Sequence, residues 1–429
     1  MKLKFIGGCK QIGGQAIALE QNEKVYLFDY GVYMNDKPKL PPLDVSVKNL
    51  QLLFLTHAHL DHSGGMPVFF SGYKIPDILM TPATKILTKI LIKDMLKLSE
   101  YYLPFGFNEL VSMLDNSIML NSHVLNWNHM KGIRFMPIDS GHIPGSVSFI
   151  CELDGKRILY TGDVNHRETK LLNGMINEFP SVDYVIIEST YGGVDHPPRQ
   201  EIEKDFIESI KKVIYEKKGT VLVPAFGVGR SQEIMCILHH YNVKFPVFMD
   251  GMARTVSKAL LDYKDDLRDV ELYKNALKNT TFISNSKSKY IERKSASVIP
   301  CVIIAPSGML KGGTAIFYSE QLIFDEKNAI YLVSFQLPNT LGRQLLETQT
   351  WKDGKTKVQA EIKHFPLSSH SGRSELLSLV DSIVEKSNNK PIFYIVHGDE
   401  ENSESLSEAL EDKGLETVIP NKGEEFSLV

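Results

Sequence analysis

The sequence of 429 residues lacks the features that mark membrane, secreted or disulfide-rich proteins. It has four cysteines, at positions 9, 151, 236 and 301, and their wide spacing suggests neither a Cys-x-x-Cys metal site nor a disulfide framework. No apolar run approaches the ~20 residues that span a bilayer, and the first residues, MKLKFIGGCK, lack the pattern of a signal peptide. We therefore expect no membrane partner and a cytoplasmic location.

The chain also lacks a surplus of charge of either sign. Lysine and arginine number 48 against 52 aspartates and glutamates, which gives a formal net charge of −4. This balance excludes a general attraction for nucleic acid, so any such binding has to come from a local cleft or patch. Hydrophobic residues make up 43% of the chain, enough for a large core, and the length favours two domains over one.

Short apolar segments of strand length fill the first half of the chain, and several of them end in Asp, His or Glu. Examples are KVYLFDYG, LQLLFLTH and VDYVIIEST, in which a β-branched or aromatic run stops at a polar residue. Residues 84–102 differ, because their apolar side chains recur at helical spacing with lysines on the other face. This pattern predicts an amphipathic surface helix.

From Gly193 onward, strand-like and helix-like segments alternate. A helical segment at 199–219 precedes the strand-like TVLVPAF, and GVGRSQEIMCILHH then predicts a glycine-rich turn that opens a helix. This alternation predicts a parallel, doubly wound sheet. The last ~70 residues return to strands that end in ligand-type residues, as in IKHFPLSSH and PIFYIVHGD.

Possible metal-binding side chains are most closely spaced in LLFLTHAHLDHSGG, residues 52–65. Within six residues of a strand end come His57, His59, Asp61 and His62. Residues at i and i+2 of an extended chain point the same way, so His57 and His59 can share one metal ion. Asp61 and His62 lie on the following turn and can face a second ion. Imidazole and carboxylate donors in this mixture suit zinc or manganese better than calcium.

Three other strand ends offer further ligands, namely His142 in SGHIPGS, Asp163 in LYTGD and His397 in YIVHGD. Two metals ~4 Å apart commonly share a bridging carboxylate and a bridging hydroxide, and Asp163 is the natural bridge. Seven histidines lack this context and are expected to be ordinary surface or core residues: His123, His129, His166, His196, His239, His240 and His364.

HAHLDH resembles the signature motif of the metallo-β-lactamase superfamily, and the other early motifs also match: Asp29 in LFDYG, His142 in GHIPGS and Asp163 in YTGD. The later part resembles the β-CASP nucleases of that superfamily, which include archaeal cleavage and polyadenylation specificity factor nucleases and RNase J. The marks of this branch are Glu188 in VIIESTYG, His370 in SSHSG and His397 in VHGD. PAFGVGRSQE, APSGMLKGG and NTLGRQLLE match as well.

The resemblance implies an α/β chain with a four-layer αββα metallo-β-lactamase domain, interrupted by an inserted doubly wound α/β β-CASP domain. We expect residues 1–192 and 363–429 to form the first domain and residues 193–362 to form the inserted one. Neither the appended RNA-binding domains of some archaeal relatives nor the extra C-terminal domain of bacterial RNase J fits this sequence. We therefore expect a minimal catalytic core.

The resemblance also implies two zinc ions, with manganese suited to the same donors. The implied ligands are His57, His59 and His142 for the first metal, Asp61, His62 and His397 for the second, and Asp163 between them. Asp29 would orient ligands without needing to bind metal. His370, supported by Glu188, would donate to the scissile phosphate or protonate the leaving 3′ oxygen. Many relatives have an acidic residue at the position of Gly372, so the orientation of His370 stays open.

The inserted domain is expected to bring the substrate to the metals. Ser307 and Gly308 in APSGM follow a strand at what we expect to be the start of a helix, where free N–H groups would hold a phosphate; a tight packing turn is the equal alternative. Arg230 in GVGRS and Arg343 in TLGRQ are expected in structural ion pairs first and at the phosphate backbone second. Ser369, in the SSHSG motif, is a further candidate contact to the substrate.

These features predict a metal-dependent ribonuclease that hydrolyses phosphodiester bonds of single-stranded RNA with a hydroxide shared by the two metals, in RNA processing or decay. RNA is favoured over DNA because His397 is a histidine, where DNA-repair relatives usually have an aliphatic residue. The basic segment 284–297 is expected to be a solvated loop, with tracking of a single RNA strand as the alternative.

The alternatives are a catalytically silent RNA-binding subunit and a metallohydrolase of small esters or lactams. No motif distinguishes an endonuclease from a 5′-to-3′ exonuclease, or zinc from manganese. A homodimer and RNA-processing protein partners are expected only by likeness to the family.

Overall fold

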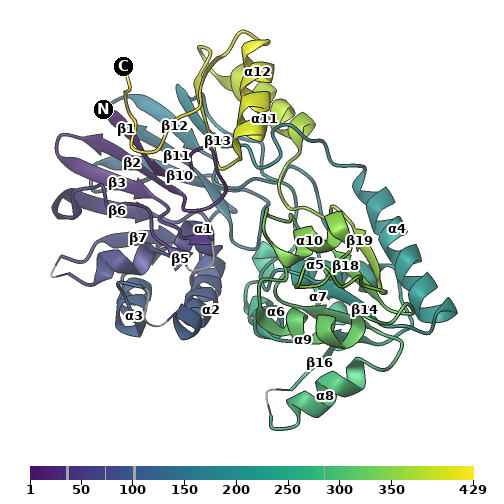
Figure 1. Cartoon of the computed structure of the whole chain (residues 1–429). Helices are drawn as coiled ribbons and strands as arrows, with labels where there is room; N and C mark the ends of the chain where they lie inside the picture. The colour runs from purple at the N-terminus through teal and green to yellow at the C-terminus, as the bar shows by residue number, and fades with distance from the viewer. Residues whose placement is uncertain (35–37, 73, 100–102, 285) are drawn as a thin grey trace. The chain divides into compact units, whose positions relative to one another are not determined.

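Two compact units divide the chain in the computed structural model (Figure 1). The structure describes residues 1–34, 38–72, 74–99, 103–284 and 286–429. The first unit consists of Met1–Glu168, Asn173–Asp195 and His370–Val429, and the second of Thr169–Leu172 and His196–Ser369. The boundary expected before residue 363 has to move, because residues 363 and 364 belong to a strand that pairs within the second unit's sheet.

One seven-stranded sheet of the first unit has the strand order β22-β1-β2-β3-β6-β7-β8. These strands are β22 (Glu425–Ser427), β1 (Lys2–Gly7), β2 (Ala16–Gln21), β3 (Lys24–Phe28), β6 (Leu50–Phe54), β7 (Asp77–Met80) and β8 (Ser117–Met119). β22 pairs antiparallel with β1, with Phe426 opposite Leu3, so the last strand lies beside the first. Two short strands, β4 (Tyr33–Met34) and β5 (Pro38–Lys39), pair separately.

The other seven-stranded sheet has the order β21-β20-β13-β12-β11-β10-β9. These strands are β21 (Glu416–Val418), β20 (Ile392–Val396), β13 (Tyr184–Glu188), β12 (Lys156–Tyr160), β11 (Val147–Leu153), β10 (Ile133–Asp139) and β9 (Asn128–Met130). β12, β13 and β20 are parallel neighbours. Their carboxyl ends therefore meet at one edge of this sheet.

Aromatic side chains fill the space between the two sheets of the first unit. Phe28 and Phe54 of the first sheet stack with their ring centroids 4.7 Å apart. Phe149 of the second sheet lies 5.1 Å from Phe54, and Tyr160 lies 5.6 Å from Phe28. All four are buried in one apolar cluster. Rings of this size each bury on the order of 150–250 Å², so this layer is a main source of the first unit's stability.

Helices cover the outer faces of both sheets, which completes the expected four-layer αββα arrangement (Figure 1). On the first sheet lie α2 (Pro82–Ser99) and α3 (Phe107–Asp115), and on the second lie α11 (Arg373–Lys386) and α12 (Glu400–Glu411). α2 is amphipathic as predicted, with Ile92 and Met95 buried and its lysines toward solvent. Residues 100–102 of that predicted helix lie outside the described residues. Among the helices that are described, none is long and apolar enough to cross a membrane.

The second unit has a six-stranded sheet of order β16-β15-β17-β14-β18-β19, in which every pair is parallel. The strands are β14 (Val221–Pro224), β15 (Val247–Met249), β16 (Thr281–Phe282), β17 (Val302–Ala305), β18 (Ala329–Leu332) and β19 (Glu361–His364). The helices are α4 (Arg199–Lys211), α5 (Arg230–His240), α6 (Met252–Ala259), α7 (Val270–Lys278), α8 (Lys289–Ala296), α9 (Gly313–Leu322) and α10 (Leu341–Thr348).

Helices pack on both faces of this sheet, as a doubly wound fold requires. On one face, Leu222 and Ile330 share an apolar cluster with Leu322 of α9 and Leu345 of α10. On the other face, the ring of Tyr331 lies 6.3 Å from that of Phe206 in α4. The prediction of an inserted doubly wound α/β domain is therefore confirmed.

Two local predictions in the second unit are wrong. In the basic segment 284–297, residues Lys289–Ala296 form the helix α8 instead of a loop, and Arg293 of this helix pairs with the buried Asp250, with Nε 2.6 Å from Oδ2; Asn285 lies outside the described residues. The helix expected to open at Ser307 begins at Gly313, since residues 308–309 form a turn and residues 310–312 a bend.

Candidate metal centre

The HAHLDH motif, residues 57–62, follows β6 and runs into the short helix α1 (Leu60–Ser63). The strand stops at Phe54, two residues follow, and His59 is the N-cap residue of α1. The chain passes so close to Gly31 that a Cβ there would lie 1.6 Å from the carbonyl oxygen of Asp61. The turn therefore depends on a residue with no side chain at position 31, and it presents His57, His59 and Asp61 from one tight bend.

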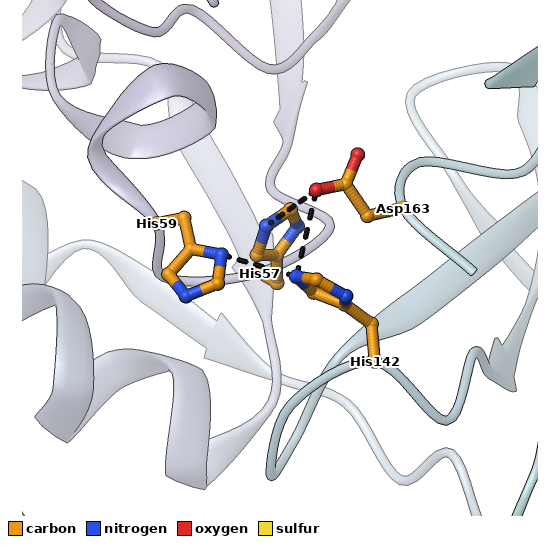
Figure 2. Close-up of side chains that lie close together, drawn as sticks. All are labelled: His57, His59, His142 and Asp163. Carbon is orange, nitrogen blue, oxygen red and sulfur yellow. Dashed lines mark hydrogen bonds and ion pairs between the residues drawn. The ribbon is translucent and has the colours of Figure 1, made fainter. Parts of the chain in front are cut away.

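Four of the expected ligands form a first group, drawn in Figure 2. The members are His57, His59, His142 and Asp163, and one donor atom from each lies within 4.8 Å of the others. His59 Nδ1 is 3.1 Å from His142 Nε2. Asp163 Oδ2 is 3.4 Å from His57 Nε2 and 3.5 Å from His142 Nε2. His142 comes from the loop after β10 and Asp163 from the loop after β12, so three strand ends build this group.

Asp61, His62 and His397 form a second group. His397 Nε2 lies 3.3 Å from His62 Nε2 and 3.4 Å from Asp61 Oδ2. The other oxygen of Asp163, Oδ1, is 3.2 Å from His62 Nε2 and 3.1 Å from His397 Nδ1. Asp163 thus faces the first group with Oδ2 and the second with Oδ1, which is the arrangement a carboxylate needs to lie between two cations.

The chemistry of these donors fits bound metal. His57 is completely buried, and among the described residues its Nε2 has no hydrogen-bond partner, an arrangement that costs free energy unless a ligand compensates it. Burial lowers the pKa of His57 well below its usual value and that of His59 to about 4. Both imidazoles are therefore neutral near pH 7, as metal coordination requires.

The carboxylate of Asp163 is ionised. Burial alone would raise its pKa, but the imidazoles of His397 and His62 lower it well below the usual range. Nitrogen and ionised oxygen donors at strand ends suit a zinc-type ion.

Asp29 lies behind the second group and accepts four hydrogen bonds. Its Oδ1 accepts from the Thr56 N–H at 2.8 Å. Its Oδ2 accepts from the Thr56 hydroxyl at 2.8 Å, from His62 Nδ1 at 2.8 Å and from the Tyr160 hydroxyl at 2.7 Å. A carboxylate can only accept, so Nδ1 of His62 carries a proton, and Nε2, which faces Asp163, is the ring nitrogen that would bind a metal.

Glu188 and His370 form a pair beside the first group. His370 Nδ1 is 3.0 Å from Glu188 Oε1 and 3.2 Å from Oε2, and its Nε2 is 4.0 Å from Asp163 Oδ2. Glu188 is fixed in turn by the backbone N–H groups of Val164 at 2.8 Å and Thr190 at 3.2 Å. Burial would lower the pKa of His370, but the carboxylates of Glu188 and Asp163 raise it to about 9.

Gly372 occupies the N-cap position of α11. Its backbone N–H donates to Glu375 Oε2 at 2.5 Å. No side chain at position 372 therefore helps to orient His370, whereas Glu188 contacts its Nδ1 at 3.0 Å.

The four expected substrate contacts lie in the second unit. Arg230, the first residue of α5, donates from Nη2 to the Ser369 hydroxyl at 2.7 Å. Gly308 is tightly packed, since a Cβ there would lie 3.1 Å from Ser334 Oγ. Ser307 Oγ accepts from the N–H of Lys311 at 3.2 Å. The packing alternative thus accounts for Gly308, and substrate contact by these residues stays a prediction.

Arg343 forms the expected ion pair, with Glu347 at 2.6 Å. The seven histidines expected to play ordinary roles take part in neither ligand group. Sequence reasoning missed Thr56 and Tyr160, because a threonine and a tyrosine at strand ends look like core residues and only the fold brings them to Asp29.

Family models match most of the chain. The Metallo-beta-lactamase superfamily matches residues 11–224, the Beta-Casp domain residues 231–345, and the Zn-dependent metallo-hydrolase RNA specificity domain residues 355–420. The fold and the His/Asp groups thus define a metallo-hydrolase of the metallo-β-lactamase type.

Curated relatives match nearly the whole of this chain. RNase aCSPSF2 of Saccharolobus solfataricus is 35% identical over 99% of this chain and 85% of its own. Probable RNase MJ4 of Methanocaldococcus jannaschii is 32% identical over 100% of both chains. Transcription termination factor FttA of Thermococcus kodakarensis is 31% identical over 98% of this chain and 70% of its own. The chain therefore belongs to the β-CASP family of the metallo-β-lactamase superfamily.

A solved structure shares the fold over the whole chain. A crystal structure of an Enterococcus faecalis V583 protein matches with a TM-score of 0.61 at 13% identity, covering 100% of this chain and 99% of that one.

Proposed function

We propose that this chain is a hydrolytic ribonuclease of the β-CASP family that cleaves phosphodiester bonds of single-stranded RNA in RNA processing or decay. The observation that carries this proposal is the carboxylate of Asp163, which faces two separate ligand groups with its two oxygens, beside the Glu188–His370 pair. The matched RNA specificity domain and the relatives named as RNases support RNA as the substrate.

We further propose two zinc ions, with manganese suited to the same donors. The residues that would hold them are His57, His59 and His142 for the first, Asp61, His62 and His397 for the second, and Asp163 between them. Bound there, the metals would supply Lewis acidity to the phosphoryl group and an activated water as nucleophile. Asp29 would keep His62 in the tautomer with a free Nε2.

His370 supplies the proton in this proposal. Glu188 at 3.0 Å stabilises the imidazolium form, so Nε2 keeps its proton near pH 7 and points toward Asp163. From there it would donate to the scissile phosphate, or protonate the 3′ oxygen as it leaves. Glu188 itself is buried and fixed by backbone N–H groups, so its role is to support His370.

Substrate contact by Ser307, Gly308, Arg230 and Ser369 is part of the same proposal, as are cytoplasmic location, a homodimer and RNA-processing protein partners. The complete set of seven ligand side chains weighs against a catalytically silent subunit, because such a subunit does not need two intact ligand groups.

The test is digestion of one single-stranded RNA prepared with a 5′-monophosphate and with a 5′-triphosphate, each labelled separately at either end, with zinc or manganese added. Nucleotides released progressively from the 5′ end, faster with the monophosphate, would identify an exonuclease. Internal fragments that do not depend on the 5′ group would identify an endonuclease. His57→Ala and His370→Ala serve as controls. Absence of metal-dependent cleavage of either RNA, with a small ester hydrolysed instead, would overturn the proposal.

A further inference from the structure

Two chain segments that carry functional side chains run side by side in the first unit. One is the stretch that follows Asp163, and the other is the stretch on either side of His370. The N–H of Ser371 donates to the Val164 carbonyl at 2.8 Å, and the N–H of His166 donates to the Ser371 hydroxyl at 2.9 Å. The two segments are therefore hydrogen-bonded to each other, so a displacement of one would also displace the other.

The first segment continues into residues 169–172, which belong to the second unit. There the carboxylate of Glu233 in α5 accepts two backbone N–H groups, that of Lys170 on Oε1 at 3.1 Å and that of Leu171 on Oε2 at 2.8 Å. Arg268 secures the same segment, with its N–H donating to the Leu171 carbonyl at 2.9 Å. The segment is thus fixed by its backbone a few residues after Asp163.

The second segment is tied to the same carboxylate through Arg199. Its Nη2 donates to Glu233 Oε1 at 2.5 Å, and its Nη1 donates to the Ser368 carbonyl at 3.1 Å, two residues before His370. Glu233 is only 2% exposed. Charge-assisted hydrogen bonds to a buried carboxylate are strong, and removing one partner leaves the others poorly compensated.

We infer that Glu233 is a positioning residue for the reaction, because it anchors the two segments that lead directly to Asp163 and His370. This inference rests on the proposed function. Only five residues separate Asp163 from Thr169. A displacement of the backbone held by Glu233 would therefore displace the carboxylate of Asp163 through a short stretch of chain. A misplacement of about 1 Å at a reacting group costs on the order of 100-fold in rate.

The test compares Glu233→Gln with the matched variant Glu203→Gln. Glu203 is also buried, and it pairs with the same arginine, with Arg199 Nε at 3.1 Å. It also pairs with Lys170 Nζ at 3.3 Å. Both partners are side chains, so these ion pairs do not hold the backbone of the segment. We expect Glu233→Gln to lower kcat on RNA by roughly 10- to 100-fold with KM within about twofold. Glu203→Gln should keep kcat close to that of the wild type, even if it lowers thermal stability as much as Glu233→Gln does.

Hydrogen exchange of the peptide that covers residues 163–172 gives a readout that does not need activity. Glu233→Gln should speed exchange there and Glu203→Gln should not. Equal losses of kcat and protection in both variants, or unchanged kcat and exchange in Glu233→Gln, would overturn the inference. If the wild-type protein fails to cleave RNA, the proposed function fails, and exchange together with the rate of zinc release to a chelator still decides whether Glu233 is an anchor.

Discussion

Replacing Asp29 by asparagine tests how the second ligand group is held. The substitution suits the backbone, because Asp29 has φ +54° and asparagine tolerates this left-handed conformation as well as aspartate does. Its oxygen can still accept from the Thr56 N–H. Its amide nitrogen, however, replaces the Oδ2 atom that accepts from the Thr56 hydroxyl, from His62 Nδ1 and from the Tyr160 hydroxyl.

The three donors respond differently to that amide nitrogen. Hydroxyl groups can rotate and become acceptors, but an imidazole nitrogen cannot. His62 has to move its proton from Nδ1 to Nε2, which is the atom 3.2 Å from Asp163 that would bind metal. Losing a charge-assisted hydrogen bond costs about 1.5–3 kcal/mol, and at 1.4 kcal/mol per decade this corresponds to roughly 10- to 100-fold in affinity. Changes to the partners of metal ligands have effects of that size.

The assay is zinc titration in competition with a chromophoric chelator. Wild-type protein should show two tight sites. Asp29→Asn should keep one of them, held by the group of His57, and weaken the other by roughly 10- to 100-fold. Tyr160→Phe is the matched control, because it removes one of the four bonds to Asp29 and leaves the tautomer of His62 unchanged.

Two results would refute this reasoning. If Asp29→Asn binds both zinc ions as tightly as wild type, the tautomer of His62 does not depend on Asp29. If Tyr160→Phe weakens zinc as much as Asp29→Asn does, the effect belongs to the hydrogen-bond network as a whole and not to the proton on Nδ1.

The remaining predictions concern the proton donor, the metal ligands and the core. In metal-free protein, Glu188→Gln should lower the pKa of His370 from about 9 toward its ordinary 6.5, as measured by NMR. Because the folded pKa is raised, the pair stabilises the fold fully below pH ~6.5 and loses this effect as the pH rises toward 9; the difference in unfolding free energy between wild type and variant should shrink across that window. His57→Ala should lower the zinc content measured by mass spectrometry, whereas His370→Ala should keep both ions and lose cleavage. Phe54→Ala should cost about 3–5 kcal/mol in urea unfolding, while alanine at the half-exposed Phe324 should cost less than ~1 kcal/mol.

Clear hydrophobic periods allowed part of the architecture to be predicted from the sequence, whereas the four-layer arrangement of the first unit was implied only by the family resemblance. The parallel sheet of the second unit follows from alternating strands and helices, and α2 follows from its apolar stripe. The end of the second unit could not be placed, because β19 carries the polar residues Glu361, Lys363 and His364 and is recognised as a strand of that sheet only by its pairing with β18. α8 was missed for a similar reason, since Arg293 looks like a solvated cation until Asp250 is placed beside it.

The candidate site likewise contains some residues that the sequence reveals and others that only the fold reveals. The sequence alone indicates four of the ligands, because they lie close together in the chain: His57, His59, Asp61 and His62. Contacts between distant residues, such as Glu188 with His370, follow from resemblance to a family and not from spacing. The partners of Asp29 carry no signal at all, because the tyrosine and threonine that bond it are common in strands and their hydroxyls acquire a role only through the packing of the two sheets.

The topology of the second sheet explains why residues so far apart in the chain meet at one place. Asp163 follows β12, Glu188 ends β13 and His397 follows β20, and these three strands are parallel neighbours. Parallel strands bring their carboxyl ends to one edge, where ligands are usually bound. β20 is paired on both sides, with β13 and with β21. The strand that leads to His397 is thus an interior strand of the sheet, so the second ligand group can form only when the chain that follows the second unit has joined this sheet.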